Sequence, residues 1–337
     1  MASWVSGYNS VMNLQRQFVN QMAAGDMVDQ VFLVRDKELR TARNGSLYLQ
    51  CTLADRTGTI AGRMWQTSES IFNSIPPDGF VQVKGRTEDY RGSLQFVIDA
   101  LRPWPSEKVD LGDFLAVTPF DIEAMWAELL EILHDIKDRH LRALLKKFHE
   151  DRDLVAAFKR APAAMTVHHA YLGGLLEHTL GMARAAKAVL PLYQNEVNAD
   201  LVLAGIFLHD IGKIAELTTG TSMGYTDRGQ LLGHITIAAV WIHQRARQVA
   251  DETSEPFPGK LVDLLAHIVL SHHGTLEFGS PRLPAIPEAF VVHYLDNLDA
   301  KLWLTTHQIA NDPDTKSSFT PYVRELETRL YKRSREL

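Results

Sequence analysis

A histidine and an aspartate stand side by side at the end of a strongly apolar segment. The run Leu201-Val-Leu-Ala-Gly-Ile-Phe-Leu208 predicts a buried helix, and His209-Asp210 follows it directly. A carboxylate at the end of a buried helix is costly to desolvate unless a cation or hydrogen-bond donors compensate its charge. The neighbouring imidazole makes a metal ion a suitable compensating cation. Alternatively, the helix end is exposed and carries an ordinary His and Asp.

Further residues of metal-ligand type follow on separate predicted helices. His178 lies in Gly173-Gly-Leu-Leu-Glu-His178-Thr-Leu-Gly and shares a helical face with apolar neighbours such as Leu175, so it points inward. Other helices contribute His234, His272, His273 and Asp296. Each of these alone is more simply a packed core histidine or a surface acid. Together they predict a metal centre inside a helical bundle.

The order His, His-Asp, His, His-His and Asp resembles the HD superfamily of metal-dependent phosphohydrolases, between Met165 and Lys301. The resemblance implies two ions that share Asp210 as a bridge. The first ion would be held by His178, His209, Asp210 and Asp296, and the second by His234, His272 and His273. Relatives differ in whether both members of the His272-His273 pair bind metal.

The expected chemistry is hydrolysis of a phosphate ester. Imidazole and carboxylate ligands suit divalent ions such as Mn²⁺, Fe²⁺, Co²⁺, Zn²⁺ or Mg²⁺. Two ions about 3.5–4 Å apart would activate a water molecule as hydroxide and neutralise the charge of the phosphate. Asp210, as the bridge, and Lys213, as a cation that reaches the phosphate, are the predicted catalytic residues. The alternative for Lys213 is an exposed lysine at a helix C-terminus, where the helix dipole favours it.

The elements that must position these residues predict two domains. A chain of 337 residues exceeds a comfortable single core. From Thr118, a candidate N-cap followed by Pro119 at the first helical position, the apolar period is helical. We therefore expect an N-terminal extension (1–25), a barrel domain (26–104), a linker (105–117) and an all-α HD bundle (118–337). The expected helices are 121–136, 141–149, 154–160, 172–190, 200–209, 235–250, 261–271, 287–310 and 321–335.

Residues 26–104 show the two-residue period of β-strands. Strands at 31–34, 46–53 and 59–65, a helix at 68–75, and strands at 80–86 and 93–101 match a five-stranded OB-fold barrel. The fold class is therefore α+β and multidomain. An OB-fold commonly binds single-stranded nucleic acid through aromatic rings and cations. The candidates are Tyr48, Arg63, Trp65, Lys84, Arg86, Tyr90 and Arg91, with Phe96 as a further ring. Alternatively, these aromatics pack the barrel or face the second domain.

Composition narrows the class of protein. The chain is 45% hydrophobic and 23% charged, as in ordinary globular proteins. A net charge of −6 argues against a surface coated with basic residues, so any nucleic-acid site is a local groove. Cys51 is the single cysteine, which excludes an intramolecular disulfide and favours a reducing compartment. No apolar run approaches the ~20 residues of a membrane helix, so we expect a cytoplasmic protein without membrane contact.

The whole arrangement resembles the YhaM-type 3′-to-5′ exoribonucleases over nearly the full chain. The resemblance rests on the barrel, the bundle, and the motifs His168-His169-Ala-Tyr-Leu-Gly-Gly-Leu-Leu-Glu-His178-Thr and Ser271-His-His-Gly274. It implies trimming of single-stranded RNA, with DNA as a further candidate, from a free 3′ end to nucleoside 5′-monophosphates, usually with Mn²⁺. A homo-oligomer is compatible with this assignment. We expect His168 and His169 either to contact substrate or support the metal site, or to pack as a loop on the bundle.

Two alternatives stay open. A nucleotide or cyclic-dinucleotide phosphohydrolase would keep the same metals but would not need the barrel. The cyclic-dinucleotide branch carries Gly-Tyr-Pro after its histidine pair, where this chain reads Phe278-Gly-Ser-Pro281. A non-catalytic nucleic-acid-binding regulator would retain the HD domain as a scaffold, although the complete ligand set argues against it.

Overall fold

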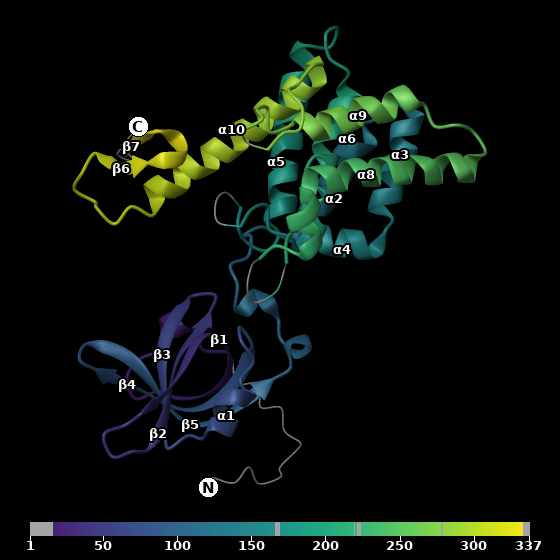
Figure 1. Ribbon diagram of the computed structural model, residues 1–337. Helices are drawn as coiled ribbons and strands as arrows, with labels where there is room; N and C mark the ends of the chain where they lie inside the picture. Colours follow the sequence, from purple (N-terminus) through teal and green to yellow (C-terminus); the bar gives the residue numbers. More distant parts are fainter. Residues whose placement is uncertain (1–15, 166–168, 219, 221–223, 278, 333–337) are drawn as a thin grey trace. The chain divides into compact units, whose positions relative to one another are not determined.

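The computed structural model describes residues 16–165, 169–218, 220, 224–277 and 279–332. The chain divides into two compact units between Ala116 and Val117, and each unit has its own apolar core. As predicted, the first is a closed β-barrel and the second is mainly a bundle of helices (Figure 1). None of the described helices is both long and apolar enough to cross a membrane.

The barrel has five strands in the order β1-β2-β3-β5-β4. Neighbouring strands are antiparallel except β3 and β5, which are parallel. Side chains alternate along the strands: in β2, Leu49, Cys51 and Leu53 are buried in the core, whereas Gln50 and Thr52 between them are half-buried. The elements are β1 (Met27–Thr41), β2 (Leu47–Asp55), β3 (Gly58–Trp65), α1 (Glu69–Ser74), β4 (Phe80–Tyr90) and β5 (Ser93–Trp104). The predicted order of five strands with one helix is confirmed.

The chain after β5 continues to pack on the barrel. Phe114 is buried, and its ring lies against Phe80 of β4 with ring centroids 4.7 Å apart. The backbone N–H of Arg56 donates to the carbonyl of Asp113 at 2.9 Å. The segment expected to be a linker therefore contributes contacts to the first unit. The single-turn 3-10 helices of this unit are η1 (Val19–Gln21), η2 (Ser106–Lys108) and η3 (Leu111–Asp113).

The helices of the second unit mostly begin where a short polar side chain accepts a backbone N–H. Such N-caps are Asp121, Asp138, Asp151, Asn198 and Thr226. The helix start predicted at Thr118 is wrong, because Asp121 supplies the cap and the Thr118 hydroxyl donates to Glu177 instead. The helices are α2 (Ile122–His134), α3 (Arg139–His149), α4 (Arg152–Arg160), α5 (Gly174–Val189), η4 (Leu190–Leu192), α6 (Ala199–Leu208), α7 (Lys213–Glu216), α8 (Asp227–Thr253), α9 (Gly259–Ser271) and α10 (Pro287–Ala310).

The helix predicted over 321–335 is wrong for the described part of that range, up to residue 332, because the chain forms a β-hairpin there. After α10, β6 (Phe319–Val323) and β7 (Thr328–Tyr331) pair antiparallel around η5 (Arg324–Leu326) (Figure 1). Pro321 lies where the register shifts, a position at which a strand tolerates a residue without an N–H. Glu327 has a φ of 52° and turns the chain back. The second unit is therefore helical with one small sheet.

Candidate metal centre and nucleic-acid surface

Five segments of the bundle bring the predicted ligands together. They are carried by α5, the end of α6, α8, the end of α9, and α10. The side chains are His178, His209, Asp210, His234, His272, His273 and Asp296. The first five are buried, although all seven are polar. Burying so many polar groups is unfavourable unless each has a partner.

Asp210 lies between two groups of histidines. Its Oδ2 is 3.3 Å from Nε2 of His209 and 3.9 Å from Nε2 of His178. Its Oδ1 is 3.3 Å from Nε2 of His234 and 3.6 Å from Nε2 of His272. The two oxygens of one carboxylate thus face two different sets of imidazoles, an arrangement suited to a bridge between two ions.

Each set is compact. In the first, Nε2 of His178 is 3.3 Å from both Nε2 of His209 and Oδ1 of Asp296. In the second, one ligand atom from each of His234, His272 and His273 lies within 4.8 Å of the others. Both members of the histidine pair therefore lie in the second set.

In four of these histidines, the second ring nitrogen contacts an acceptor. Nδ1 of His209 donates to the carbonyl of Ile206, and Nδ1 of His272 to the carbonyl of Val269, both at 2.7 Å. The Nδ1 atoms of His178 and His234 are 2.7 Å from Asp299 and 2.9 Å from Glu216. Because a carbonyl or carboxylate can only accept, Nδ1 carries the proton, and the lone pair of a neutral ring is on Nε2. These lone pairs face Asp210.

Three buried ligand atoms lack a hydrogen-bond partner within the described ranges. They are Oδ1 of Asp210, Nε2 of His234 and Nε2 of His272. A lone pair left unpaired in a protein interior is costly, and here three are gathered around one carboxylate oxygen. A divalent cation would satisfy all three at once, so the residues present fit a metal ion.

The electrostatics of Asp210 and of the His272-His273 pair agree with metal binding. Burial would raise the pKa of Asp210, but Lys213 and His209 hold it well below its usual range. Burial lowers the pKa of His272, and it lowers that of His273 to about 4. The carboxylate is therefore charged and these two imidazoles are neutral at pH 7, which are the forms that bind metal.

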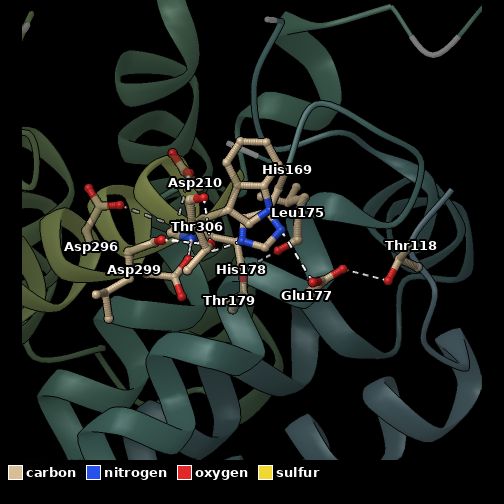
Figure 2. A network of polar contacts seen from close by, with 12 residues as sticks. Thr118, His169, Leu175, Glu177, His178, Thr179, Asp210, Asp296, Asp299 and Thr306 are labelled. Atoms are coloured by element: carbon tan, nitrogen blue, oxygen red, sulfur yellow. Dashed lines mark hydrogen bonds and ion pairs between the residues drawn. The ribbon is translucent and has the colours of Figure 1, made fainter. Parts of the chain in front are cut away.

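Asp299 and Glu216, which the sequence analysis did not single out, orient two of the ligands. Figure 2 shows Asp299 pointing at His178, together with Asp210 and Asp296. Glu216 accepts from the backbone N–H of His234 at 2.9 Å and contacts Nδ1 of the same ring. Burial would raise the pKa of both carboxyl groups, but contacts with His169 and His178 lower it for Asp299, and those with His234 lower it for Glu216. Such partners fix ring orientation and tautomer at metal sites.

His169 lies inside the same network. It is 5% exposed, and its Nε2 is 3.4 Å from Oδ2 of Asp299. Its Nδ1 is 2.7 Å from the hydroxyl of Tyr171, which donates to Glu177. Of the roles expected for this residue, support of the metal site agrees best with these contacts. His168 lies outside the described residues.

Two glycines permit the close approach of the segments that carry Asp210 and His234. A Cβ on Gly212 would lie 2.1 Å from the carbonyl oxygen of His234, so only glycine fits. Gly233 has a φ of 68° and breaks the helical path of α8 immediately before His234. This break explains why the apolar period of the helix begins only at Ile235, whereas α8 extends back to Asp227.

Lys213 contacts the bridge and also lines a cavity. Its Nζ donates to Oδ2 of Asp210 at 2.5 Å. The cavity has a volume of about 500 Å³, within the range of small-molecule sites. Asp210, Lys213, His273 and Asp296 line it, so it opens onto the metal ligands.

Most of the predicted strand-binding residues form one cluster on the barrel. The rings of Tyr48 and Trp65 have centroids 5.0 Å apart. The Arg63 guanidinium lies 6.0 Å from the Trp65 ring and 5.3 Å from the Tyr90 ring, and Arg91 is also 5.3 Å from Tyr90. Trp65 and Tyr90 are 48% and 42% exposed, which leaves their faces accessible. We call these five residues the aromatic-arginine cluster.

Of the remaining candidates for strand binding on the barrel, Lys84 and Arg86 are exposed and Phe96 is buried. The register places Arg63 and Arg86 on either side of Val97, so Arg86 continues the row of outward side chains. Lys84 and Arg86 form exposed ion pairs with Asp29 and Asp99. Phe96, considered as a stacking ring, is fully buried in the barrel core, so that expectation is wrong. Phe96 shares the inner face of β5 with Ile98, two residues further along the strand.

Fold and site together define a two-domain class: an OB-type barrel joined to a helical bundle with the His and Asp ligands of a metal-dependent phosphohydrolase. The family model described as an HD domain matches residues 175–301, and the one described as an OB-fold nucleic acid binding domain matches residues 31–104. The relatives identified by sequence name a narrower group.

The 3′-5′ exoribonuclease YhaM of Bacillus subtilis is 35% identical over 82% of this chain and 86% of its own. The protein of the same name from a Geobacillus species is 34% identical over 91% of this chain and 92% of its own. A solved structure, PriB from Ralstonia solanacearum, aligns with 25% of this chain and 100% of its own at 17% identity and a TM-score of 0.22. The chain belongs to the YhaM family of 3′-5′ exoribonucleases.

Proposed function

We propose that this protein is a cytoplasmic, metal-dependent 3′-5′ exoribonuclease that shortens single-stranded RNA and releases nucleoside 5′-monophosphates. The observation that carries the proposal is the gathering of six ligand side chains around Asp210, the seventh, with three atoms of the set lacking a hydrogen-bond partner in the described structure. Membership of the YhaM family supports the substrate class and the direction. In this proposal, residues 118–337 hydrolyse the terminal phosphodiester and residues 26–104 bind the strand.

The proposed metal content is two divalent ions, with Mn²⁺ the first to test. His178, His209, Asp210 and Asp296 would hold one, and His234, His272 and His273 the other, with Asp210 shared. When bound, such ions acidify water and neutralise phosphate oxygens. Their ligands are kept in place by Asp299, Glu216 and the carbonyls of α6 and α9.

The chain's own residues have separate tasks in the hydrolysis. Release of a 5′-monophosphate requires the oxygen of water to bond to phosphorus while the bond from phosphorus to the 3′ oxygen breaks and that oxygen gains a proton. Lys213, on the cavity wall, would stabilise the charge that grows on the phosphate. The cavity excludes most of the strand, because about 500 Å³ holds a nucleotide-sized group.

The aromatic-arginine cluster supports strand binding by the barrel. Every base offers a face for stacking, and each stacked base contributes about 1–3 kcal/mol without sequence preference. The guanidinium groups of Arg63 and Arg91 beside the rings add cations for the phosphates. Exposed ion pairs such as Lys84–Asp29 are weak, so Lys84 remains available to the strand.

The test uses the purified full-length chain with Mn²⁺ and four substrates: a 5′-labelled RNA, the same sequence as DNA, a cyclic dinucleotide and a nucleoside triphosphate. We expect a ladder of RNA products shortened from the 3′ end and nucleoside 5′-monophosphates in the supernatant. Turnover of only the cyclic dinucleotide or the triphosphate would favour a nucleotide phosphohydrolase. Binding of the strand without turnover in Mn²⁺, Fe²⁺, Co²⁺, Zn²⁺ or Mg²⁺ would favour a non-catalytic regulator.

A further inference from the structure

The cavity at the metal ligands continues along one face of α10. Asp296 at the metal end is followed on this face by Asn297, Ala300, Lys301 and Leu304, all of which line the cavity. A helix rises about 1.5 Å per residue, so Leu304 is roughly 12 Å along the axis from Asp296. The cavity therefore has the metal ligands at one end, and both charged and apolar side chains further along the helix.

The C-terminal hairpin supplies the wall at the second end. Glu325 and Leu326 of η5 line the cavity. Glu325 also lines a second hollow, together with Gln308 and Asn311 from the end of α10. Because these two residues lie beyond Leu304, η5 is at the end of the cavity remote from Asp210 and Asp296. A segment expected to be a helix instead forms a hairpin that borders the candidate active site.

The groups along the cavity match the parts of one terminal nucleoside. The phosphate belongs at the metal end, beside Lys213. Leu304 and Leu326 offer apolar surface to a base at the other end. A carboxylate is the group that dinucleotide-binding folds use to accept hydrogen bonds from ribose hydroxyls, and Glu325 is the carboxylate that η5 contributes to the cavity lining. The same charge would repel a phosphate attached to the terminal 3′ oxygen.

We propose that this cavity is the subsite for the 3′-terminal nucleoside and that Glu325 selects an end with free ribose hydroxyls. The inference rests on the proposed exoribonuclease function and adds the feature of the end that is recognised. It makes the 2′ hydroxyl a source of preference for RNA over DNA at the last nucleotide. It also makes η5 of the hairpin a specificity-determining part of the site.

The experiment compares three otherwise identical RNA strands that end in a 3′ hydroxyl, in a 3′ phosphate, or in a 2′-deoxynucleotide. Initial rates with Mn²⁺ are measured for the wild type, Glu325→Gln and Glu325→Lys. Glu327→Gln is the matched control, because Glu327 is exposed two residues further on and is outside the cavity lining given by the described residues. Glu325 is itself exposed, so neither substitution disturbs the core.

For the wild type we expect the 3′-hydroxyl strand to be cleaved roughly tenfold or more faster than the other two, the effect of one charge-assisted hydrogen bond. Glu325→Gln should reduce several-fold the rate ratios of the 3′-hydroxyl strand to the 3′-phosphate strand and to the 2′-deoxy strand. Glu325→Lys should cleave the 3′-phosphate strand faster than the wild type does. Glu327→Gln should retain the wild-type ratios. If both Glu325 variants cleave RNA with wild-type ratios, the subsite assignment is overturned while the proposed function stands. If the wild type shortens none of the strands, the proposed function fails and this inference fails with it.

Discussion

Nδ1 of His178 lies 2.7 Å from Oδ2 of Asp299, although 121 residues separate the two in the chain. The same carboxylate oxygen is 3.4 Å from Nε2 of His169. Asp299 thus holds two rings, and the first of them directs Nε2 at Asp296 and Asp210. The orientation of a predicted metal ligand therefore depends on a carboxylate that is not itself in the ligand set.

Asp299→Asn should weaken metal binding without emptying the site. The amide keeps the shape of the side chain but loses the charge that orders the His178 ring, and loss of such partners typically costs about 10–100-fold in metal affinity. We expect the rate of RNA hydrolysis to recover at higher Mn²⁺ concentration. Titration calorimetry with Mn²⁺ measures the affinity directly, and Asp263→Asn, an exposed change on α9, is the control. Equal affinities in the two variants would show that Asp299 does not position the ligand.

Asp210→Ala should abolish turnover and leave strand affinity largely intact. The substitution removes the only side chain whose two oxygens face both histidine groups in the described structure. It also leaves the Lys213 ammonium without the partner that it contacts at 2.5 Å. Fluorescence anisotropy with a labelled RNA measures binding while product analysis measures cleavage. Undiminished cleavage would rule out Asp210 as the bridge.

Trp65→Ala should weaken binding of single-stranded RNA by about 1–3 kcal/mol, the contribution of one stacked base. The ring is 48% exposed and lies near both Tyr48 and Arg63 in the aromatic-arginine cluster. Trp65→Phe keeps an aromatic face and should recover most of the affinity. Binding is measured by anisotropy at fixed ionic strength, because phosphate contacts depend strongly on salt. If Trp65→Ala binds RNA with wild-type affinity, the ring does not stack on a base.

Cys51 should resist alkylation in the folded protein. Burial in the barrel core, with a smaller effect of Asp36, raises the pKa of its thiol from 9.0 to about 12. At pH 8 this lowers the reactive thiolate fraction by about a thousandfold. Mass spectrometry after treatment with iodoacetamide should therefore show modification in urea but not in buffer. Rapid labelling without denaturant would contradict the buried, protonated thiol.

The same shift has a signed effect on stability. The folded state retains the Cys51 proton up to about pH 12, whereas the unfolded state loses it near pH 9. The unfolded state thus binds fewer protons between these values, and the free energy of unfolding should fall as pH rises. Urea unfolding at pH 8 and pH 10 measures the slope. Cys51→Ala isolates the contribution of the thiol, since the other titrating groups are common to both chains.

Segments with one dominant period were predictable from the sequence. The alternation of Leu49, Cys51 and Leu53 identified β2, and the helical period over 287–310 identified α10 with its bounds. The hairpin was not predictable in this way. Val323, Leu326 and Leu330 are spaced three and four apart, as on a helix, and Pro321 resembles a helix start. Pairing of Phe319 with Tyr331 across the hairpin, with ring centroids 5.4 Å apart, overrides this local pattern.

The ligand residues were recognisable because their types and order are unusual in apolar helices. Their supports were not. Asp299 and Glu216 are ordinary acids in helical sequence, and each matters only through a histidine on another element. Likewise, the sequence around Phe96 does not show whether its ring points into or out of the barrel, because that depends on the strand register. Contacts between distant segments decide these cases, and a single sequence does not contain them.

The ligands come from five segments that stretch from His178 to Asp296, so the binding atoms meet only when the whole bundle is assembled. Ions that bind the assembled form but not the unfolded chain raise the melting temperature by mass action. Chelation should consequently lower the melting temperature of the bundle. The melting temperature of the barrel should not change, because the barrel has a separate core. Heat resistance of the catalytic half would then report how much metal a cell supplies.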